Sequence, residues 1–518
     1  MSGFEIAGIV LGSIPLVIVA LEHYAEGLST IKSMQKYEEA FGYLHASFVT
    51  IACIYRNSCE ELLSPLALSD AQLSQLLENR ESSAWENPEL SDALRSRLGS
   101  NYLPFKSSVK QLNKKINLFG RKLQLDKNFQ HYKELLSSIE EDISRISNLT
   151  AGAIALEPLR LQRRRKANTE YLIRFRQQAE KLYDAFNTRW SPRCMCQCTH
   201  QANLRLDIQK DDEAGQSSTF KLVFTFGSLH AGTTAPWKSI PVEIEAVDVI
   251  DTPKPYNSSP LPSIIVHSNI KAHDHWKCLK RAPDIVDLCA TLQRCPSPDC
   301  IGVMSSKLAK HHIHTLHLPS AKTTDKRVTL QEIMTTQGTI FQIKEKCTLA
   351  LTLASAVYHL HNTPWLEETW NLNDICILSQ SLLSDQPYIS REFPATAASP
   401  AQSQRMRIIK NSIIFALGVA LLEISYGKPL STFVTSEDLD ANGNRTAFTD
   451  YLIADRLAEG LRTRELPNYA DATQRCIHCN FEASAYSLDD DDFRERFYQG
   501  VIVPLRKDYE YVVSTAVT

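Results

Sequence analysis

The sequence predicts a mainly helical α+β fold, in which an N-terminal helical bundle precedes a small β-rich part and a helical lobe. In the first third of the chain, apolar residues recur at alternating three- and four-residue steps. Short stretches rich in Val, Ile, Leu and Phe follow Pro192, and helix-length apolar segments return later. We therefore expect a bundle at 1–190, a β-rich part at 191–327 and a helical lobe at 328–518.

Length and composition indicate a large globular protein. The 518 residues are 43% hydrophobic and 22% charged, close to globular averages. These values exclude a wholly disordered chain, a collagen-like fibre and a small disulfide scaffold. The net charge of -3 argues against a nucleic-acid binder, because phosphate binding needs an excess of Lys and Arg. The 13 Cys residues are scattered and odd in number, so we interpret most as reduced thiols of an intracellular, cytoplasmic protein.

The N-terminal segment is apolar but short. Met1–Glu5 contains no positive residue, whereas a secretory signal starts with a basic region, so we expect no signal peptide. The longest apolar run, Ala7–Leu21, has 15 residues, fewer than the roughly 20 that a membrane-spanning helix needs. We expect a helix near Ile6–Tyr24 that is central in the bundle, with peripheral membrane association as the alternative.

Four further segments carry an apolar stripe at helical spacing, at 34–55, 105–123, 129–146 and 172–186. Such helices bury their stripes against one another, as in a helix bundle. Between the first two segments, Ser64-Pro65, Asn87-Pro88 and Gly99 predict shorter helices and loops. Trp190-Ser191-Pro192 ends the helical pattern, so we place a domain boundary there.

Charge is unevenly distributed over this region. Residues 1–100 carry a net charge of -7 and residues 101–190 a net charge of +9. The two segments can pair with each other, or leave a basic face for a partner or for anionic lipid. We interpret the cluster Arg163-Arg164-Arg165-Lys166 as a solvated helical turn; a nuclear-import signal or a lipid head-group contact is the alternative.

The middle of the chain is predicted to contain strands and loops. The candidate strands are Asn203–Ile208, Thr219–Phe226, Val242–Val249 and Ser263–Val266. Asp251–Ser263 contains four Pro residues and is expected to be a surface loop.

Two groups of Cys and His residues could ligate a metal. In the group near residue 196, no second Cys or His pair follows at the sequence spacing that structural zinc prefers. In the group between residues 289 and 314, the Cys and His residues are too far apart in the sequence. We expect ordinary thiols, no metal and no cofactor, and leave open whether Cys194, Cys196 and Cys198 bind a metal. The first group is Cys194, Cys196, Cys198 and His200; the second is Cys289, Cys295, Cys300, His311, His312 and His314.

A third pattern, Cys476-Ile477-His478-Cys479, is a CxxC within a predicted helix. A redox role needs a thioredoxin-like βαβ context, which this sequence lacks.

Two strongly apolar helices are predicted in the C-terminal region, Lys344–His361 and Ile413–Pro429, the second with a Gly-Lys-Pro stop. A helix ending in Leu-His, then a loop with Asn373-Asp374-Ile375, then an apolar helix resembles the large lobe of protein kinases. The details are more similar to a fungal family of domain of unknown function 7580. The segments that carry this resemblance are Leu360–Leu366, Pro387–Ser390, Phe415–Pro429, Arg475–Phe481 and Phe493 through Leu505.

The kinase resemblance lacks the parts that phosphoryl transfer needs. The sequence has no GxGxxG, Val-Ala-Ile-Lys, His-Arg-Asp or Asp-Phe-Gly, and residues 219–250 offer only Gly227 and Gly232. If Asp374 stands where kinases hold a metal-binding Asn, then Thr369, or Glu368 after a shift of one, stands in place of the base. Ile413 falls where kinases have a structural Asp. The resemblance therefore implies a pseudokinase, and we assign no catalytic, cofactor-binding or metal residue.

Several single residues receive a structural interpretation. We expect Trp365 and Trp370 in the core, His361 at the helix end and Asp374 as a cap of the next segment. The run Asp489–Asp492 predicts a helix cap and first turn, where negative charge is favoured, followed by the apolar residues Phe493, Phe497 and Val501. A metal site there is the weaker alternative, because one flexible acidic run lacks a cage.

A bundle followed by a kinase-like lobe also resembles necroptosis-type executioners and fungal HeLo-like cell-death proteins, whose bundles attack membranes. Phe4–Leu21 is similar in position and apolar character to the membrane-active start of such bundles. Our leading hypothesis is a non-catalytic pseudokinase-like signalling or scaffold protein with protein partners and no nucleic acid, which can form a homo-oligomer. The alternatives are a membrane-acting cell-death or heterokaryon-incompatibility effector that reaches an anionic membrane through residues 1–190, and a divergent kinase.

Overall fold

The computed structural model describes most of the chain, and the statements below concern the described residues. These are 14–32, 38–66, 70–78, 88–123, 129–190, 199–208, 219–226, 239–248, 282–294, 300–306, 309–316, 323–337, 341–379, 386–393, 408–446 and 448–515.

The chain divides into two compact units, Met1–Lys166 and Ala167–Thr518, which we call unit 1 and unit 2. The division differs from the expected boundary at residue 190 and lies inside a helix. The reason is that the apolar stripe at 172–186 packs in unit 2 rather than in the bundle.

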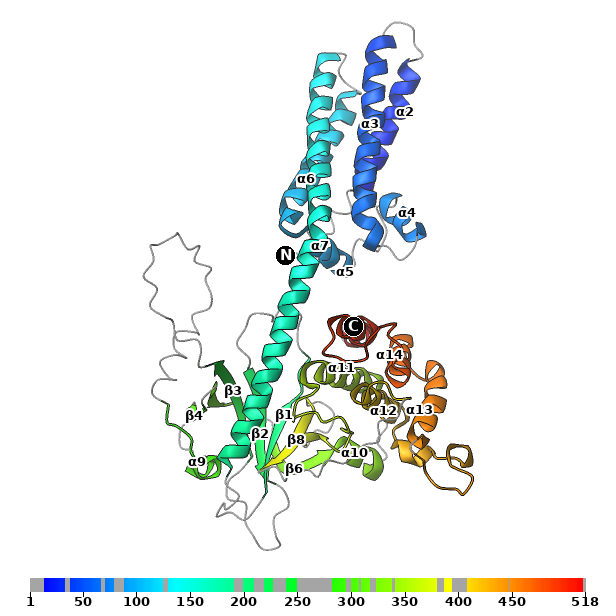
Figure 1. Cartoon of the computed structure of the whole chain (residues 1–518). Helices are drawn as coiled ribbons and strands as arrows, with labels where there is room; N and C mark the ends of the chain where they lie inside the picture. The colour runs from blue at the N-terminus through cyan, green and yellow to red at the C-terminus, as the bar shows by residue number, and fades with distance from the viewer. Residues whose placement is uncertain are drawn as a thin grey trace. The chain divides into compact units, whose positions relative to one another are not determined.

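Unit 1 is helical, as its periodicity predicted (Figure 1). Its core contains apolar residues of α2, α3, α6 and the N-terminal half of α7, such as Val17, Phe48, Phe105 and Ile139. Short helices fill the region between α3 and α6, as the breaks predicted. The elements are α2 (Ile14–Lys32), α3 (Glu38–Leu63), η1 (Ser64–Leu66), α4 (Asp70–Glu78), α5 (Pro88–Leu98), η3 (Gly99–Asn101), α6 (Tyr102–Leu123) and α7 (Phe129–Arg189).

Helix α2 is a core helix of unit 1 over the part that can be described. Ile14, Val17, Ile18 and Leu21 are at most 1% exposed. The start of the predicted membrane-active segment, residues 4–13, lies outside the described residues. Of the helices that the structure describes, none is both long and apolar enough to cross a bilayer.

Helix α7 corrects one prediction. The stripes at 129–146 and 172–186 were expected on two helices, but they belong to a single helix of 61 residues. The sequence between them is rich in Ala, Leu and Arg, which favour helix, and no Gly or further Pro follows Pro158 in it. The basic cluster Arg163–Lys166 is an exposed part of this helix, as we interpreted it.

Unit 2 contains one eight-stranded antiparallel sheet, in the order β4-β5-β3-β2-β1-β8-β7-β6. The predicted strands near 203, 219 and 242 are confirmed as β1, β2 and β3, whereas 251–266 lies outside the described residues. The sheet is not confined to 191–327, because β7 and β8 come from the region expected to be a helical lobe. The strands are β1 (His200–Arg205), β2 (Thr219–Phe226), β3 (Ile240–Asp248), β4 (Cys300–Ser305), β5 (Ala309–Thr315), β6 (Thr323–Thr329), β7 (Ile375–Ser379) and β8 (Tyr388–Phe393).

The C-terminal half of α7 packs on this sheet. Phe186 contacts the rings of Phe224 on β2 and Phe393 on β8, and Trp190 stacks on His200 of β1. The buried indole of Trp365 donates a hydrogen bond to the Ala179 carbonyl of α7 (2.9 Å). Aromatic burial of this kind contributes strongly to stability, which explains why this part of the helix belongs to unit 2.

A helical region follows the sheet (Figure 1). The two predicted apolar helices are confirmed as α11 and α12, and the Gly-Lys-Pro stop is confirmed by Gly427, whose φ of 67° ends α12 in the left-handed conformation. The helices of unit 2 after α7 are α9 (Leu288–Arg294), α10 (Leu330–Gln337), α11 (Ile343–Leu360), α12 (Ser412–Tyr426), η5 (Leu430–Phe433), η6 (Ser436–Asp438), α13 (Thr449–Glu459), η7 (Leu461–Thr463), α14 (Pro467–His478), α15 (Asp491–Phe497), the π-helical turn η8 (Tyr498–Ile502) and α16 (Val503–Thr515).

Candidate functional site

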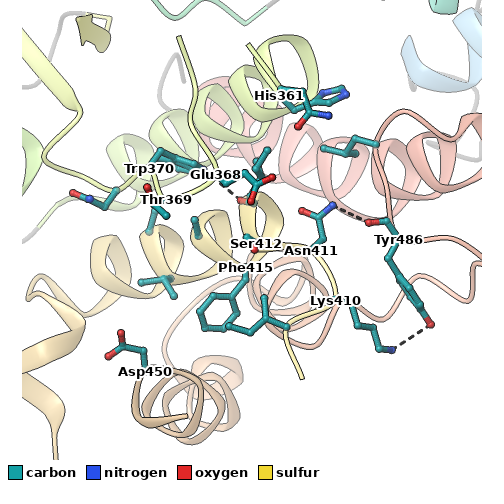
Figure 2. Close-up of a pocket in the computed structure, with 18 of the residues that line it drawn as sticks. His361, Glu368, Thr369, Trp370, Lys410, Asn411, Ser412, Phe415, Asp450 and Tyr486 are labelled. Atoms are coloured by element: carbon teal, nitrogen blue, oxygen red, sulfur yellow. Dashed lines mark hydrogen bonds between the residues drawn. The ribbon is translucent and has the colours of Figure 1, made fainter. Parts of the chain in front are cut away.

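A cavity of about 700 Å³ lies in the helical region of unit 2. His361 after α11, the loop that follows it, one side of α12 and the segment before α15 contribute to the lining of this cavity (Figure 2). Its volume lies in the range of small-molecule and peptide side-chain pockets. It is therefore the candidate binding site of this unit.

His361 lies at one edge of the cavity and is 1% exposed. Its Nδ1 faces the carbonyl oxygens of Val357 and Tyr358 at 3.1 Å each. Carbonyl oxygens only accept, so Nδ1 carries the proton and Nε2 accepts from the Arg176 guanidinium of α7. Burial, aided by the charge of Arg176, lowers the pKa of His361 to about 4. His361 thus donates a hydrogen bond to the last backbone carbonyl groups of α11, as its predicted role at the helix end requires.

Asp489 completes this cluster from the segment before α15. Its carboxylate accepts from Arg176 (2.8 Å) and from the side-chain amide of Asn362 (2.8 Å). These bonds hold the pKa of Asp489 below its ordinary value, although partial burial opposes them. Arg176 and Asp489 are 313 positions apart, so no local pattern in the sequence could have paired them.

Asp374 is held outside the cavity. Its carboxylate forms an ion pair with Arg391 of β8 (2.7 Å) and accepts from the backbone N–H of Asn371 (3.0 Å). It therefore caps the turn that precedes it, rather than the next segment as we expected. Arg391 also donates to the Pro364 carbonyl (3.1 Å), which connects Asp374 to the loop after α11.

The loop residues that face the cavity are Glu368, Thr369 and Trp370 (Figure 2). Glu368 and Thr369 are exposed, whereas Trp365 and Trp370 are at most 3% exposed, as their predicted core role requires. The Trp370 indole points its N–H at the Ile413 carbonyl (3.4 Å), so it joins the loop to α12.

The opposite wall presents polar groups. Asn411 caps α12 through the Ile414 N–H and donates to the Tyr486 carbonyl (2.9 Å), while Lys410 lies 4.5 Å from the centre of the Tyr486 ring (Figure 2). Deeper in the cavity, Glu423 accepts from the Leu430 N–H (2.8 Å). Burial raises the pKa of Glu423 to about 7, so it holds a proton for part of the time at neutral pH. The sequence contained no signal for this carboxyl group, which lies within an apolar helix.

The acidic run before α15 has the predicted capping role. Asp490 accepts from the Phe493 N–H (2.9 Å), and Asp491 and Asp492 occupy the first turn. Phe493, Phe497 and Val501 are buried, as expected.

The structure describes only part of the two predicted metal groups. Cys194, Cys196, Cys198 and Cys295 lie outside the described residues, and Cys289 is a buried core residue of α9. Cys300, His312 and His314 lie together on β4 and β5. Cys476 and Cys479 are buried at the end of α14, and burial raises the pKa of both thiols, so neither has the thiolate character of a redox cysteine.

Comparison with known proteins agrees with the division of the chain. A domain of unknown function (DUF7580) matches residues 169–512, which is nearly all of unit 2. No protein among those with curated descriptions matches the chain. The matched segment covers more than half of the chain, so this chain belongs to the DUF7580 family.

Proposed function

We propose that this chain is a non-catalytic, pseudokinase-like signalling or scaffold protein, and that the cavity of unit 2 binds a segment of a protein partner. The observation that carries the proposal is that two groups beside the loop after α11, which could serve acid–base or metal chemistry in a kinase, are already engaged in structural contacts. Asp374 is ion-paired with Arg391, and His361 is neutral against Arg176.

The order of elements supports the kinase-like part of the proposal. Helix α11 ends at the Leu-His pair, the loop and strands β7 and β8 follow, and α12 comes next. This is the order of the large lobe in kinases, although β8 here pairs with β1 in the single sheet. A kinase would need a free carboxylate for Mg²⁺ and a base beside the substrate hydroxyl. At these places the chain has the paired Asp374 and the exposed Thr369, or the exposed Glu368 after a shift of one residue.

The cavity has the mixed lining that suits a protein segment. Phe415 and Val419 offer apolar surface, and Lys410 and Glu423 offer a cation and a proton-holding carboxyl. Protein interfaces use such combinations of an apolar centre with a few polar contacts.

The first experiment compares the thermal midpoint of the full chain with and without ATP and Mg²⁺. Ligand that binds only the folded state must raise the midpoint. We expect no shift at millimolar ATP and no phosphotransfer. Phosphotransfer that is lost in Asp374→Ala or Glu368→Ala would establish a divergent kinase instead.

The second experiment tests the cavity directly by quantitative partner capture from cells. We expect Lys410→Glu, on the cavity wall, to reduce capture of specific partners, and Arg462→Glu, in an exposed ion pair outside the cavity lining, to leave capture unchanged. Equal capture by both variants would contradict a binding role of the cavity.

A second candidate function is a membrane-acting effector, favoured by the +9 charge of residues 101–190 and by the exposed Lys110 and Lys114 of α6. Anionic lipid attracts such residues by about 1 kcal/mol each. Under this hypothesis, the full chain binds vesicles containing phosphatidylserine, and both a deletion of residues 1–21 and the double variant Lys110→Glu, Lys114→Glu weaken binding. Unchanged binding in both variants would exclude the bundle as the membrane contact.

A further inference from the structure

Three side chains that commonly bind transition metals meet on two neighbouring strands of unit 2. One ligand atom each of Cys300 on β4 and of His312 and His314 on β5 lie within 4.8 Å of one another. His312 and His314 alternate along β5, so they share one face of the sheet. Cys300 lies directly opposite His314 in the antiparallel pair, so it points to the same face.

A β-bulge is responsible for the position of Cys300. The register shifts between Cys300 and Gly302, so that Gly302 pairs with Ile313 while Cys300 pairs with His314. In a regular ladder Ile301 would stand opposite His314, and Cys300 would point to the other face. Gly302 has a φ of 148°, and a Cβ there would lie 2.6 Å from the Pro283 carbonyl oxygen. Glycine therefore permits the backbone path that directs the thiol toward the two imidazoles.

Two contacts in this group are nearly as long as the spacing between ligand atoms in a tetrahedral metal site, although they use different nitrogens of His312. The Cys300 sulfur lies 3.2 Å from His312 Nε2, and His314 Nε2 lies 3.1 Å from His312 Nδ1. With Zn–N near 2.0 Å and Zn–S near 2.3 Å, ligand atoms around tetrahedral zinc are about 3.3–3.6 Å apart. A single ion uses one nitrogen of His312, so binding replaces one of these two contacts.

The neighbouring strand adds carboxylates to the same face. Glu243 and Glu245 of β3 stand directly opposite His314 and His312, respectively. Metal-bound imidazoles usually donate their second N–H to an acceptor such as a carboxylate, which fixes the ring and strengthens the ligand. The alternate residues Val242, Ile244 and Ala246 point to the core, so this face is the one that lies away from it.

We propose that Cys300, His312 and His314 bind one zinc ion, with water as the fourth ligand. A thiolate and two imidazoles form a ligand set that suits Zn²⁺ and disfavours Mg²⁺ and Ca²⁺. The thiol proton passes to solvent when the metal binds. Since β4 is an edge strand of the sheet, the ion ties this edge to β5. The proposal is independent of the function assigned to the cavity.

The test titrates the reduced, metal-free full chain with Co²⁺ and then with Zn²⁺. We expect one equivalent of Co²⁺ to give the thiolate-to-cobalt charge-transfer band, Zn²⁺ to displace it, and Zn²⁺ to raise the thermal midpoint. Cys300→Ser should abolish the band, and His314→Gln should weaken Co²⁺ binding at least tenfold. Cys53→Ser, at an exposed cysteine of unit 1, is the matched control and should behave as the unmodified chain.

Two results would overturn the proposal. One is the absence of stoichiometric Co²⁺ or Zn²⁺ binding. The other is a band that persists in Cys300→Ser but disappears in the triple variant Cys194→Ser, Cys196→Ser, Cys198→Ser, which would place the metal elsewhere. His314 is only partly buried, so His314→Gln keeps the proposal testable if Cys300→Ser fails to fold, with circular dichroism as the check on folding.

Discussion

Two of the buried histidines of unit 2, His361 and His312, have different kinds of neighbours. His361 and His312 are each at most 1% exposed, and each uses both ring nitrogens in polar contacts. Beside His361 stands the permanent cation Arg176, which opposes both a proton and a metal ion. Beside His312 stand a thiol and a second imidazole, which are themselves metal ligands. Because both rings are buried, the nature of the nearest neighbours is what distinguishes the two histidines in what they can bind.

The largest loss of stability is expected from removing the Trp365 side chain, which holds the loop after His361 against α7. Trp365→Ala deletes a fully buried indole and its hydrogen bond to the Ala179 carbonyl. We expect a loss of about 3–5 kcal/mol in the free energy of unfolding, as for other buried aromatic truncations. Urea denaturation of the full chain measures it. A loss below about 1 kcal/mol would contradict the assigned packing.

The next largest effect is a pH dependence from His361. Its pKa falls from 6.5 in the unfolded chain to about 4 in the fold, so the unfolded chain binds more protons between these values. The contribution of His361 to stability is therefore present above pH 6.5 and is lost as the pH falls toward 4, by on the order of 3 kcal/mol. Stability measured across this window should depend less on pH in His361→Gln than in the unmodified chain.

Glu423 makes the free energy of unfolding depend on pH in the opposite direction to His361, over nearly the same pH range. Its pKa rises from 4.5 to about 7 on folding, so its contribution is present below pH 4.5 and is lost as the pH rises through 7. We expect Glu423→Gln to steepen the fall of stability toward low pH, because the His361 slope then stands alone. If His361→Gln and Glu423→Gln change the pH profile in the same direction, one of the two assignments is wrong.

A smaller loss of stability is expected from removing the cation beside His361, which would leave this histidine, like His312, without Arg176 as a neighbour. Arg176→Met removes the cation that Nε2 faces and the ion pair with Asp489, for a loss of about 1–3 kcal/mol. The pKa of His361 should rise toward its ordinary value, which an NMR titration of the imidazole measures. An unchanged pKa would show that burial alone holds His361 neutral.

The smallest effect is expected at the exposed ion pair of Arg462 and Asp471, whose side chains are 66% and 42% exposed. Water screens such pairs, so Arg462→Ala should change stability by about 0–1 kcal/mol. The same denaturation series measures it, and a larger loss would show that charge at the surface, and not only inside unit 2, stabilises this chain.

The sequence by itself determined the regular elements of this protein. Periodicity located α3, α6, α11 and α12, β-branched and aromatic runs located β1 to β3, and Asp490 was identifiable as a helix cap. These features depend on neighbours within a few positions, so local rules are sufficient to predict them. The absence of kinase motifs and the family resemblance were also readable in the chain.

Only the tertiary structure decided how these elements are used. It joined two predicted helices into α7 and buried the second stripe against the sheet, because aromatic contacts with Phe224 and Phe393 outweigh membership of the bundle. It paired Arg176 with Asp489 and Asp374 with Arg391, and it brought Cys300 opposite His314 through a single extra residue in β4. Such pairings depend on long-range packing and strand register, which no local pattern of residues specifies.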